Sequence, residues 1–349
     1  MTKVKFEDVA TRVNTREDRL NTSLLYYVGG EHIESNEMLV QGCGLIKGST
    51  IGPMFYCGFK KGDILLVSRN PHLRKASMVE FDGICSEKTF VLGTKDSKVL
   101  LQEFLALVMQ SDDFWNYCEE HKSGGVNYFL NWSTLAKYEF YLPSIQEQKE
   151  IADKVWSAYR LKESYKKLLV ATDEMVKSQF IEMFGGLCQD TPWSDVVTIT
   201  NGKAYPEEYQ EEGAYPICGS GGIMCYGEKK LCNGNTTILG RKGNINNPIF
   251  MESGYWIVDT AFSIDVDKAK LHPKFFYYWC CQYDFTKLNK QGVLPSLTRK
   301  DLEKVKMAIP QMRDQLKFVS IAEQADKSKF ELKQCIENID KVIKSLING

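Results

Sequence analysis

Two polar loops, each directly after an apolar segment typical of a strand, carry side chains that suit recognition of a nucleic acid. Arginine can pair bidentately with guanine and asparagine with adenine, while lysine neutralises phosphate. Taken by itself, each loop could also be an ordinary solvated surface. The first loop offers Arg69, Asn70, His72, Arg74 and Lys75, and the second offers Arg241, Lys242, Asn244 and Asn246.

Two further loops contain glycine and occupy corresponding places later in each half of the chain. They span residues 122–128 and 290–300, and each precedes the last predicted element of its half. Four polar loops at corresponding places favour a shared binding face over four unrelated surface loops. The candidate contact residues here are Lys122, Asn127, Gln291, Ser296 and Arg299.

No catalytic constellation is evident in the sequence. The four histidines are scattered, and neither a P-loop nor a nucleophile elbow is present. Residues 246–250 (NNPIF) are similar to the Asn-Pro-Pro-aromatic motif of adenine methyltransferases but lack its second proline, and no glycine-rich cofactor loop precedes them. The GSGG segment at 219–222 indicates a turn. We therefore expect a chain without catalytic residues, cofactor or metal of its own.

The charge of the chain is nearly balanced. Its 349 residues include 44 Lys and Arg against 45 Asp and Glu, a formal net charge of −1. Residues 1–143 carry 16 basic and 18 acidic residues, and residues 186–309 carry 14 of each. A protein that holds nucleic acid by electrostatics alone is markedly basic. The positive charge must therefore be local, or partner subunits must supply part of the affinity.

The sequence predicts a cytoplasmic protein with no membrane partner. No apolar run approaches the ~20 residues of a membrane span. The first residues, MTKVKFEDVATRV, contain no apolar signal-peptide core. The 11 cysteines form no CxxC pair, so we expect reduced side chains and no metal site.

The sequence contains an internal repeat. At an offset of 167 residues, segment 138–180 lies on segment 305–347 without a gap, and at an offset of 172, segment 62–69 lies on segment 234–241. The order is therefore globular unit, helix, second globular unit, second helix. Residues identical at the first offset include Gln148 and Gln315, Lys162 and Lys329, and Asp173 and Asp340.

The repeated segments show the heptad pattern of a coiled coil, with seam residues in steps of three and four. No proline or glycine interrupts residues 144–184 or 311–348. Because both helices share one pattern, we expect them to pack on each other, and polar residues such as Lys162 and Lys329 to fix their register. Packing of each helix on its own unit alone is the alternative. The seam residues are Ile151, Val155, Ala158, Tyr165, Leu169 and Val176 in the first helix and Phe318, Ala322, Leu332, Ile336 and Ile343 in the second.

The two globular units combine strands with one predicted helix each. Gly, Asn and Pro punctuate their short apolar runs, which is typical of strands joined by turns. The helices are predicted near residues 98–118 and 272–286. The predicted strands lie at 63–68, 89–92, 236–239, 255–258 and 261–266.

The whole chain resembles the specificity subunit of type I restriction–modification systems. The most specific element is LPSIQEQK at 142–149, which leads into a helix that ends in SQFIEMFG at 178–185. It is similar to the family's spacer signature, LPPLxEQ followed by a helix ending near SLFxxMFG. GDILL at 62–66 and VDTAF at 258–262 are similar to family segments as well. The second spacer, IPQMRDQ at 309–315, keeps only the proline and the final glutamine of that signature.

The resemblance implies an α+β fold with two target recognition domains in a pseudo-twofold arrangement, separated by two long antiparallel coiled-coil helices. The expected parts are target recognition domain 1 at 1–143, spacer helix 1 at 144–185, target recognition domain 2 at 186–309 and spacer helix 2 at 310–349.

The resemblance also implies a non-catalytic subunit that reads double-stranded DNA. Each domain would read one half of a bipartite target, and the helices would set the spacing and dock two methyltransferase subunits. Those subunits would bind S-adenosylmethionine and methylate adenine, and motor-nuclease subunits would join for cleavage. The alternatives are a DNA-modifying enzyme of the adenine methyltransferase type and a coiled-coil adaptor without a DNA role.

Overall fold

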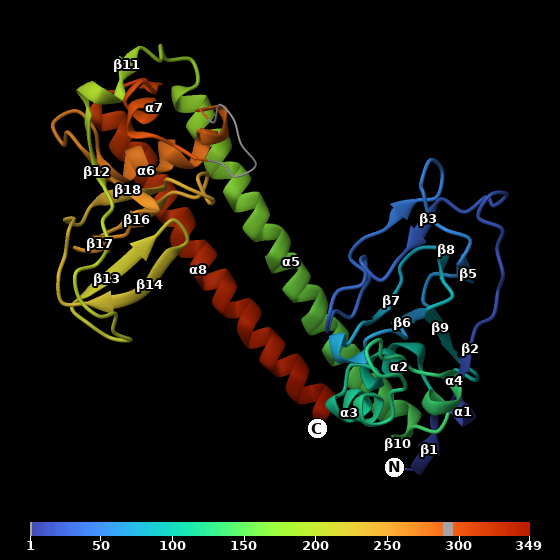
Figure 1. Cartoon of the computed structure of the whole chain (residues 1–349). Coiled ribbons are helices and arrows are strands. Elements are labelled where there is room, and N and C mark those ends of the chain that lie inside the picture. The colour runs from blue at the N-terminus through green and yellow to red at the C-terminus, as the bar shows by residue number, and fades with distance from the viewer. Residues whose placement is uncertain (1, 289–295) are drawn as a thin grey trace. The chain divides into compact units, whose positions relative to one another are not determined.

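The computed structural model describes residues 2–288 and 296–349, which divide into two compact units (Figure 1). Unit 1 comprises residues 1–166 and 333–349, and unit 2 comprises residues 167–332. Helices α5 (Ile145–Phe184) and α8 (Met312–Asn348) each contribute to both units. In the described ranges, every helix is too short or too polar to cross a membrane.

Unit 1 is built mainly from short strands. Its remaining elements, in chain order, are β1 (Thr2–Lys5), α1 (Phe6–Val9), β2 (Ala10–Arg12), β3 (Tyr26–Val28), β4 (Gly44–Leu45), β5 (Phe55–Phe59), β6 (Ile64–Val67), η1 (Pro71–Leu73), β7 (Ala76–Met78), β8 (Gly83–Ser86), β9 (Thr89–Thr94), α2 (Gln102–Val108), α3 (Asp112–Glu120), α4 (Trp132–Leu135) and β10 (Glu139–Leu142).

The central sheet of unit 1, in the order β2-β9-β6-β7, lies between a helical layer and a second sheet, β4-β3-β8-β5. Alternate side chains of a strand face opposite sides. Ile64 and Leu66 accordingly pack in the core beside the helices, and Leu65 packs in the core between the sheets. Strand β6 is buried on both faces, which explains its uninterrupted apolar sequence.

Unit 2 repeats this topology, except that in its described residues the second sheet has three strands and no counterpart of β5. Its sheets are β12-β18-β15-β16 and β14-β13-β17, and the ribbon β11-β19 corresponds to β1-β10. The elements are β11 (Thr191–Pro192), η2 (Trp193–Asp195), β12 (Val197–Asn201), β13 (Tyr215–Gly219), β14 (Gly222–Gly227), β15 (Thr236–Gly240), β16 (Ile249–Met251), β17 (Trp256–Ile257), β18 (Ala261–Val266), α6 (Pro273–Gln282), η3 (Phe285–Leu288), α7 (Arg299–Glu303) and β19 (Lys306–Met307).

The single helix predicted near residues 98–118 is wrong, because the structure has two helices there, α2 and α3. Ser111 begins the second helix by accepting a hydrogen bond from the Phe114 N–H at 3.2 Å. Serine is a favoured N-cap because its hydroxyl satisfies a free amide of the first turn. The helix predicted at 272–286 ends earlier, at Gln282, and is followed by the 3₁₀ turn η3.

Helices α5 and α8 pack in antiparallel order, as predicted. In unit 1, Ile343 near the end of α8 joins the core that contains Val155 near the start of α5. In unit 2, Phe318 near the start of α8 packs on Phe180 and Phe184 near the end of α5, with ring centroids 5.2 and 5.7 Å away. The predicted seam residues that are buried are Val155, Val176, Phe318, Ala322 and Ile343, and those that are half-buried are Ile151, Ala158, Tyr165, Leu169, Leu332 and Ile336.

Two equivalent ion pairs link the helices. In unit 1, Nζ of Lys162 lies 3.0 Å from Oδ1 of Asp340. In unit 2, Nζ of Lys329 lies 2.8 Å from Oδ1 of Asp173. The two lysines occupy equivalent positions of the internal repeat, and so do the two aspartates. The lysine of each helix therefore pairs with the aspartate of the other helix.

One buried glutamine ties each helix to its own unit. The Gln148 amide donates to the carbonyls of Val99 and Pro143 at 2.9 and 3.0 Å, and its oxygen accepts from the Leu101 N–H at 3.0 Å. Gln315 makes the corresponding three bonds in unit 2, to Lys270, Pro310 and His272. Both side chains are fully buried. The final glutamine of the spacer signature therefore has a structural task.

We predict that Gln148→Ala lowers the free energy of unfolding by about 2–3 kcal/mol, because it leaves buried backbone groups without partners. The matched control is Gln146→Ala, which removes an exposed glutamine two residues earlier on the same helix. Urea unfolding followed by tryptophan fluorescence measures both changes. Equal stabilities of the two variants would contradict the role given to Gln148.

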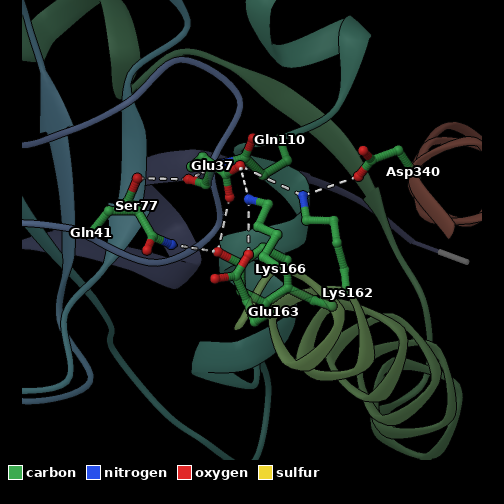
Figure 2. Close-up of polar contacts among 9 residues, drawn as sticks. Glu37, Gln41, Ser77, Gln110, Lys162, Glu163, Lys166 and Asp340 are labelled. Atoms are coloured by element: carbon green, nitrogen blue, oxygen red, sulfur yellow. Dashed lines mark hydrogen bonds and ion pairs between the residues drawn. The ribbon is translucent and has the colours of Figure 1, made fainter. Parts of the chain in front are cut away.

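A half-buried carboxylate, Glu37, connects the globular part of unit 1 to the helix pair, as Figure 2 shows. Glu37 lies 3.0 Å from Nζ of Lys166 and 3.6 Å from Nζ of Lys162, and it accepts a hydrogen bond from the Tyr159 hydroxyl at 2.9 Å. Burial raises the pKa of Glu37, but the two lysines and the tyrosine outweigh it and hold the pKa below 4.5. Lys162 in turn reaches Asp340, so this carboxylate supports the helix pairing.

We predict that Glu37 stabilises unit 1 at neutral pH and that this contribution disappears in acid. Its folded pKa is depressed, so the stabilisation is present above the unfolded value of 4.5 and is lost as the pH falls through the folded value. The difference in melting temperature between the wild type and Glu37→Gln should therefore shrink as the pH falls below 4.5. A difference that stays constant with pH, or an equal difference for the exposed control Glu34→Gln, would contradict this.

Candidate DNA interface

Two of the loops predicted to bind a nucleic acid lie side by side in unit 1. The Leu130 N–H donates to the Ser68 carbonyl at 2.8 Å, and the Asn70 N–H donates to the Tyr128 carbonyl at 2.9 Å. These bonds join the loop after β6 to the loop before α4. Residues that are distant in the sequence therefore form one continuous edge of the unit.

The second of these loops projects as a short hairpin. Ser123 and Phe129 exchange both backbone hydrogen bonds, each at 2.9 Å. Gly124 has a φ of +101°, and a Cβ at this position would lie 2.6 Å from the Asn127 carbonyl oxygen, so only glycine fits the turn. Val126 is 92 % exposed, and Asn127 is exposed beside it. The tip is thus open to a large ligand.

Arg69 stands at the side of a groove of about 380 Å³. Its guanidinium lies 5.5 Å from the centre of the Phe129 ring, and stacking of this kind orients a guanidinium while its N–H groups remain free to donate. Arg12 and Lys88 line the same groove and were not predicted from the sequence. Arg12 reaches it because β2 pairs with β9, which places the guanidinium 4.7 Å from the Phe90 ring. No spacing in the sequence connects these residues.

Other predicted residues of unit 1 have partners within the unit. Arg74 forms an ion pair with Asp112 at 2.6 Å, and the Lys75 amine donates to the Gly30 carbonyl at 2.6 Å. The Lys122 amine lies 2.6 Å from the Glu119 carboxylate. The members of the set that remain available at the edge are Arg69, Asn70, His72 and Asn127.

Unit 2 builds the same junction from its own two loops. The Leu297 N–H donates to the Arg241 carbonyl at 2.9 Å, and Lys242 pairs with Ser296 through an isolated antiparallel bridge. In unit 1 the corresponding bridge joins Arg69 and Phe129. The structure therefore brings equivalent loops together in both halves.

The strand register corrects the alignment of the two loops by one residue. Leu66 pairs with Phe90, and Leu239 pairs with Phe262, so the offset on this strand is 173 and Arg69 corresponds to Lys242. The sequence alignment matched Arg69 with Arg241 because it placed glycine 62 on glycine 234. In the structure the left-handed turn position of Gly62, with φ +94°, is taken by Asn235, with φ +57°.

The predicted residues of unit 2 are mostly exposed. Asn246 is exposed as well, but its side chain is already bonded within the unit. Its amide nitrogen donates to Asp284 at 3.1 Å, and its amide oxygen accepts from the Phe285 N–H at 2.8 Å. Hydrogen bonds from Thr286 and then from Asn246 lower the pKa of Asp284. Gln291 lies outside the described residues. Arg241, Lys242, Asn244, Ser296 and Arg299 are exposed, with Arg299 paired to Glu303 at 2.7 Å.

The two segments compared with methyltransferase motifs, residues 246–250 and 219–222, have structural roles in unit 2. Asn246 is committed to the turn that begins η3, and the residues after Pro248 enter β16. Glycines 219 and 222 pair across the β13–β14 hairpin, which is not followed by a helix and therefore lacks the geometry of a dinucleotide-type loop. The geometry does not favour the enzyme alternative.

Comparisons with known proteins point to one family. The family model described as "Type I restriction modification DNA specificity domain" matches residues 25–169 and 189–341. A specificity (S) subunit of a type I system from M. genitalium has a similar fold, with a TM-score of 0.67 at 15% identity, over 99% of this chain and 94% of that chain. No curated protein sequence matches the chain.

A second solved structure has the same fold. It comes from work on complex assembly and conformational transition of the type I restriction–modification system, and it has a TM-score of 0.60 at 17% identity, over 99% of this chain and 96% of that chain. The two stretches matched by the family model cover most of the chain and fall one in each half of the repeat. The chain therefore belongs to the family of type I restriction–modification DNA specificity domains and carries the domain twice.

Proposed function

We propose that each unit reads one half of a bipartite double-stranded DNA target through the edge formed by its two joined loops. The chain would act as the sequence-reading subunit and would have no catalytic activity of its own. The observation that carries this proposal is the repeated junction, Ser68 with Leu130 and Arg241 with Leu297. In both units it places a cation, Arg69 or Lys242, beside an exposed loop, where it can meet base edges or phosphates.

The partners would supply the chemistry and part of the affinity. Neither half has the basic excess that tight DNA binding by charge alone requires. We infer that two methyltransferase subunits dock on the two copies of the helix and unit surface, and that they bind S-adenosylmethionine and methylate adenine. Motor-nuclease subunits would join the same assembly for cleavage. The relation of one solved relative to complex assembly supports this inference.

We predict that substitutions in the two units act on separate half-sites. Arg69→Ala should cost about 1–3 kcal/mol and relax a position in one half-site, and Lys242→Ala should change only the other half-site or weaken binding at its phosphates. Sequencing of the duplexes selected by the chain assembled with its methyltransferase measures both. The matched control is Lys61→Ala, an exposed lysine at the opposite end of β6 from Arg69.

Two outcomes would contradict separate reading. One is a change in both half-sites caused by Arg69→Ala alone. The other is unchanged selection after both edge cations are replaced, with the variants still assembled.

We predict that the helix pair sets the length of the unread DNA between the half-sites. One heptad inserted after Lys166 and another after Lys333, which are equivalent positions of the repeat, preserves the seam and adds about 10 Å of helix. The gap should grow by about three base pairs, since base pairs are spaced by ~3.4 Å, while both half-sites stay the same. Seven residues inserted at Glu211, in an exposed loop of unit 2, should leave the gap unchanged. An unchanged gap in an active double-insertion variant would contradict the prediction.

A further inference from the structure

The β13–β14 hairpin of unit 2 (Figure 1) carries two adjacent apolar residues beside its turn. Ile223 is 55 % exposed and Met224 is 61 % exposed. Adjacent residues of a strand normally point to opposite faces, so at least one of the two is usually covered. Here the fold of unit 2 buries neither.

A β-bulge produces this exposure. The register passes from the pair Ile217 and Cys225 to the pair Cys218 and Ile223, so Met224 is the extra residue of the bulge. Bulges re-aim side chains and are frequent at binding sites. Gly219 leaves the necessary space, because a Cβ there would lie 3.0 Å from Sδ of Met224. The glycine-rich sequence at 219–222 therefore builds a tip that presents Ile223 and Met224.

The tip is fixed to the candidate DNA interface of unit 2. The Ser220 N–H donates to Oγ1 of Thr260 at 3.3 Å, and the Thr260 carbonyl accepts from the Arg241 N–H at 2.7 Å. A Cβ on Gly240 would lie 3.2 Å from Cβ of Ser220, so the hairpin turn packs on the backbone just before Arg241 and Lys242. The apolar tip and the cationic loop form one surface.

The charges of the hairpin distinguish its two ends. Arg241 and Lys242 lie beside the tip, whereas the acidic segment 207–212 contacts the other end, where Gln210 pairs with Tyr226. The segment carries four glutamates, of which Glu207 is paired with Lys229, so the tip is the more favourable end for a polyanion. Because the tip is joined to the loop that carries Arg241 and Lys242, it lies on the face that the proposed function assigns to DNA.

We propose, resting on the proposed function, that Ile223 and Met224 contact base pairs of the half-site read by unit 2. Apolar side chains discriminate bases by contact with the thymine methyl group, or they wedge between base steps while neighbouring cations hold the phosphates. The described residues of unit 1 contain no such hairpin tip. Its corresponding strands, β3 and β4, are connected by residues 29–43 instead of a two-residue turn. The two units thus read DNA by different means.

Photo-crosslinking tests this contact directly. The residue p-benzoylphenylalanine is placed at position 223, 224 or 242 of the full chain, which is assembled with its methyltransferase subunit, bound to target duplex and irradiated. A matched control places the probe at Tyr209, which is 59 % exposed in the acidic segment. We expect DNA crosslinks from positions 223, 224 and 242 and none from position 209.

The outcomes separate this proposal from the one on which it rests. Crosslinks to DNA from 242 but not from 223 or 224, or crosslinks from 223 and 224 only to the methyltransferase, would overturn the role of the tip alone. Failure of position 242 as well, in a complex that still binds DNA, would overturn the proposed interface of unit 2.

A substitution provides the second measurement. The double variant Ile223→Ser, Met224→Gln should weaken binding of the target about tenfold and relax one or two adjacent positions of a single half-site. Its melting temperature should stay that of the wild type, because both side chains are exposed. Unchanged selection by the folded variant, or relaxation in both half-sites, would overturn the proposal.

Discussion

The pairing of α5 with α8 is the constraint on which the rest of the structure depends. Turns of both helices take part in the core of each unit, and unit 1 is completed by residues 333–349 from the far end of the chain. Lys162 is only 7 % exposed and lies between Glu37 and Asp340. Asp340 is 52 % exposed and Asp173 is 66 % exposed, so solvent screens both interhelical ion pairs, and each contributes about 1 kcal/mol or less. Together the pairs favour the register of the two helices in which both can form.

One contact between helix and globular part is present in both units, although different residues make it. In unit 1 the Tyr159 hydroxyl on the helix donates to Glu37 of the globular part at 2.9 Å. In unit 2 the corresponding helix position is Asp326, which accepts from the Tyr278 hydroxyl of the globular part at 2.5 Å. The tyrosine–carboxylate contact is preserved with its direction reversed.

The sequence predicts the two long helices and the positions of the five proposed strands, but not how the strands pair, for a physical reason. A helix is encoded by local periodicity, so an unbroken heptad pattern defines α5 and α8 to within a residue of their observed ends. Sheets depend on pairings between distant strands, such as β1 with β10, which no local pattern encodes. The same difference affects the site: the loop residue Arg69 is predictable, whereas Arg12 joins it only through strand pairing. An alignment based on identity also misses that Asn235 can replace a glycine at a left-handed turn.

Mapping of DNA methylation tests the central claim, that one chain reads two separate half-sites. The chain is produced together with its methyltransferase subunit in a host without adenine methylation of its own, and the modified bases are located by single-molecule sequencing. We expect a single motif composed of two defined half-sites separated by a fixed number of unspecified base pairs. A continuous motif without such a gap, or methylation without sequence preference, would contradict the account.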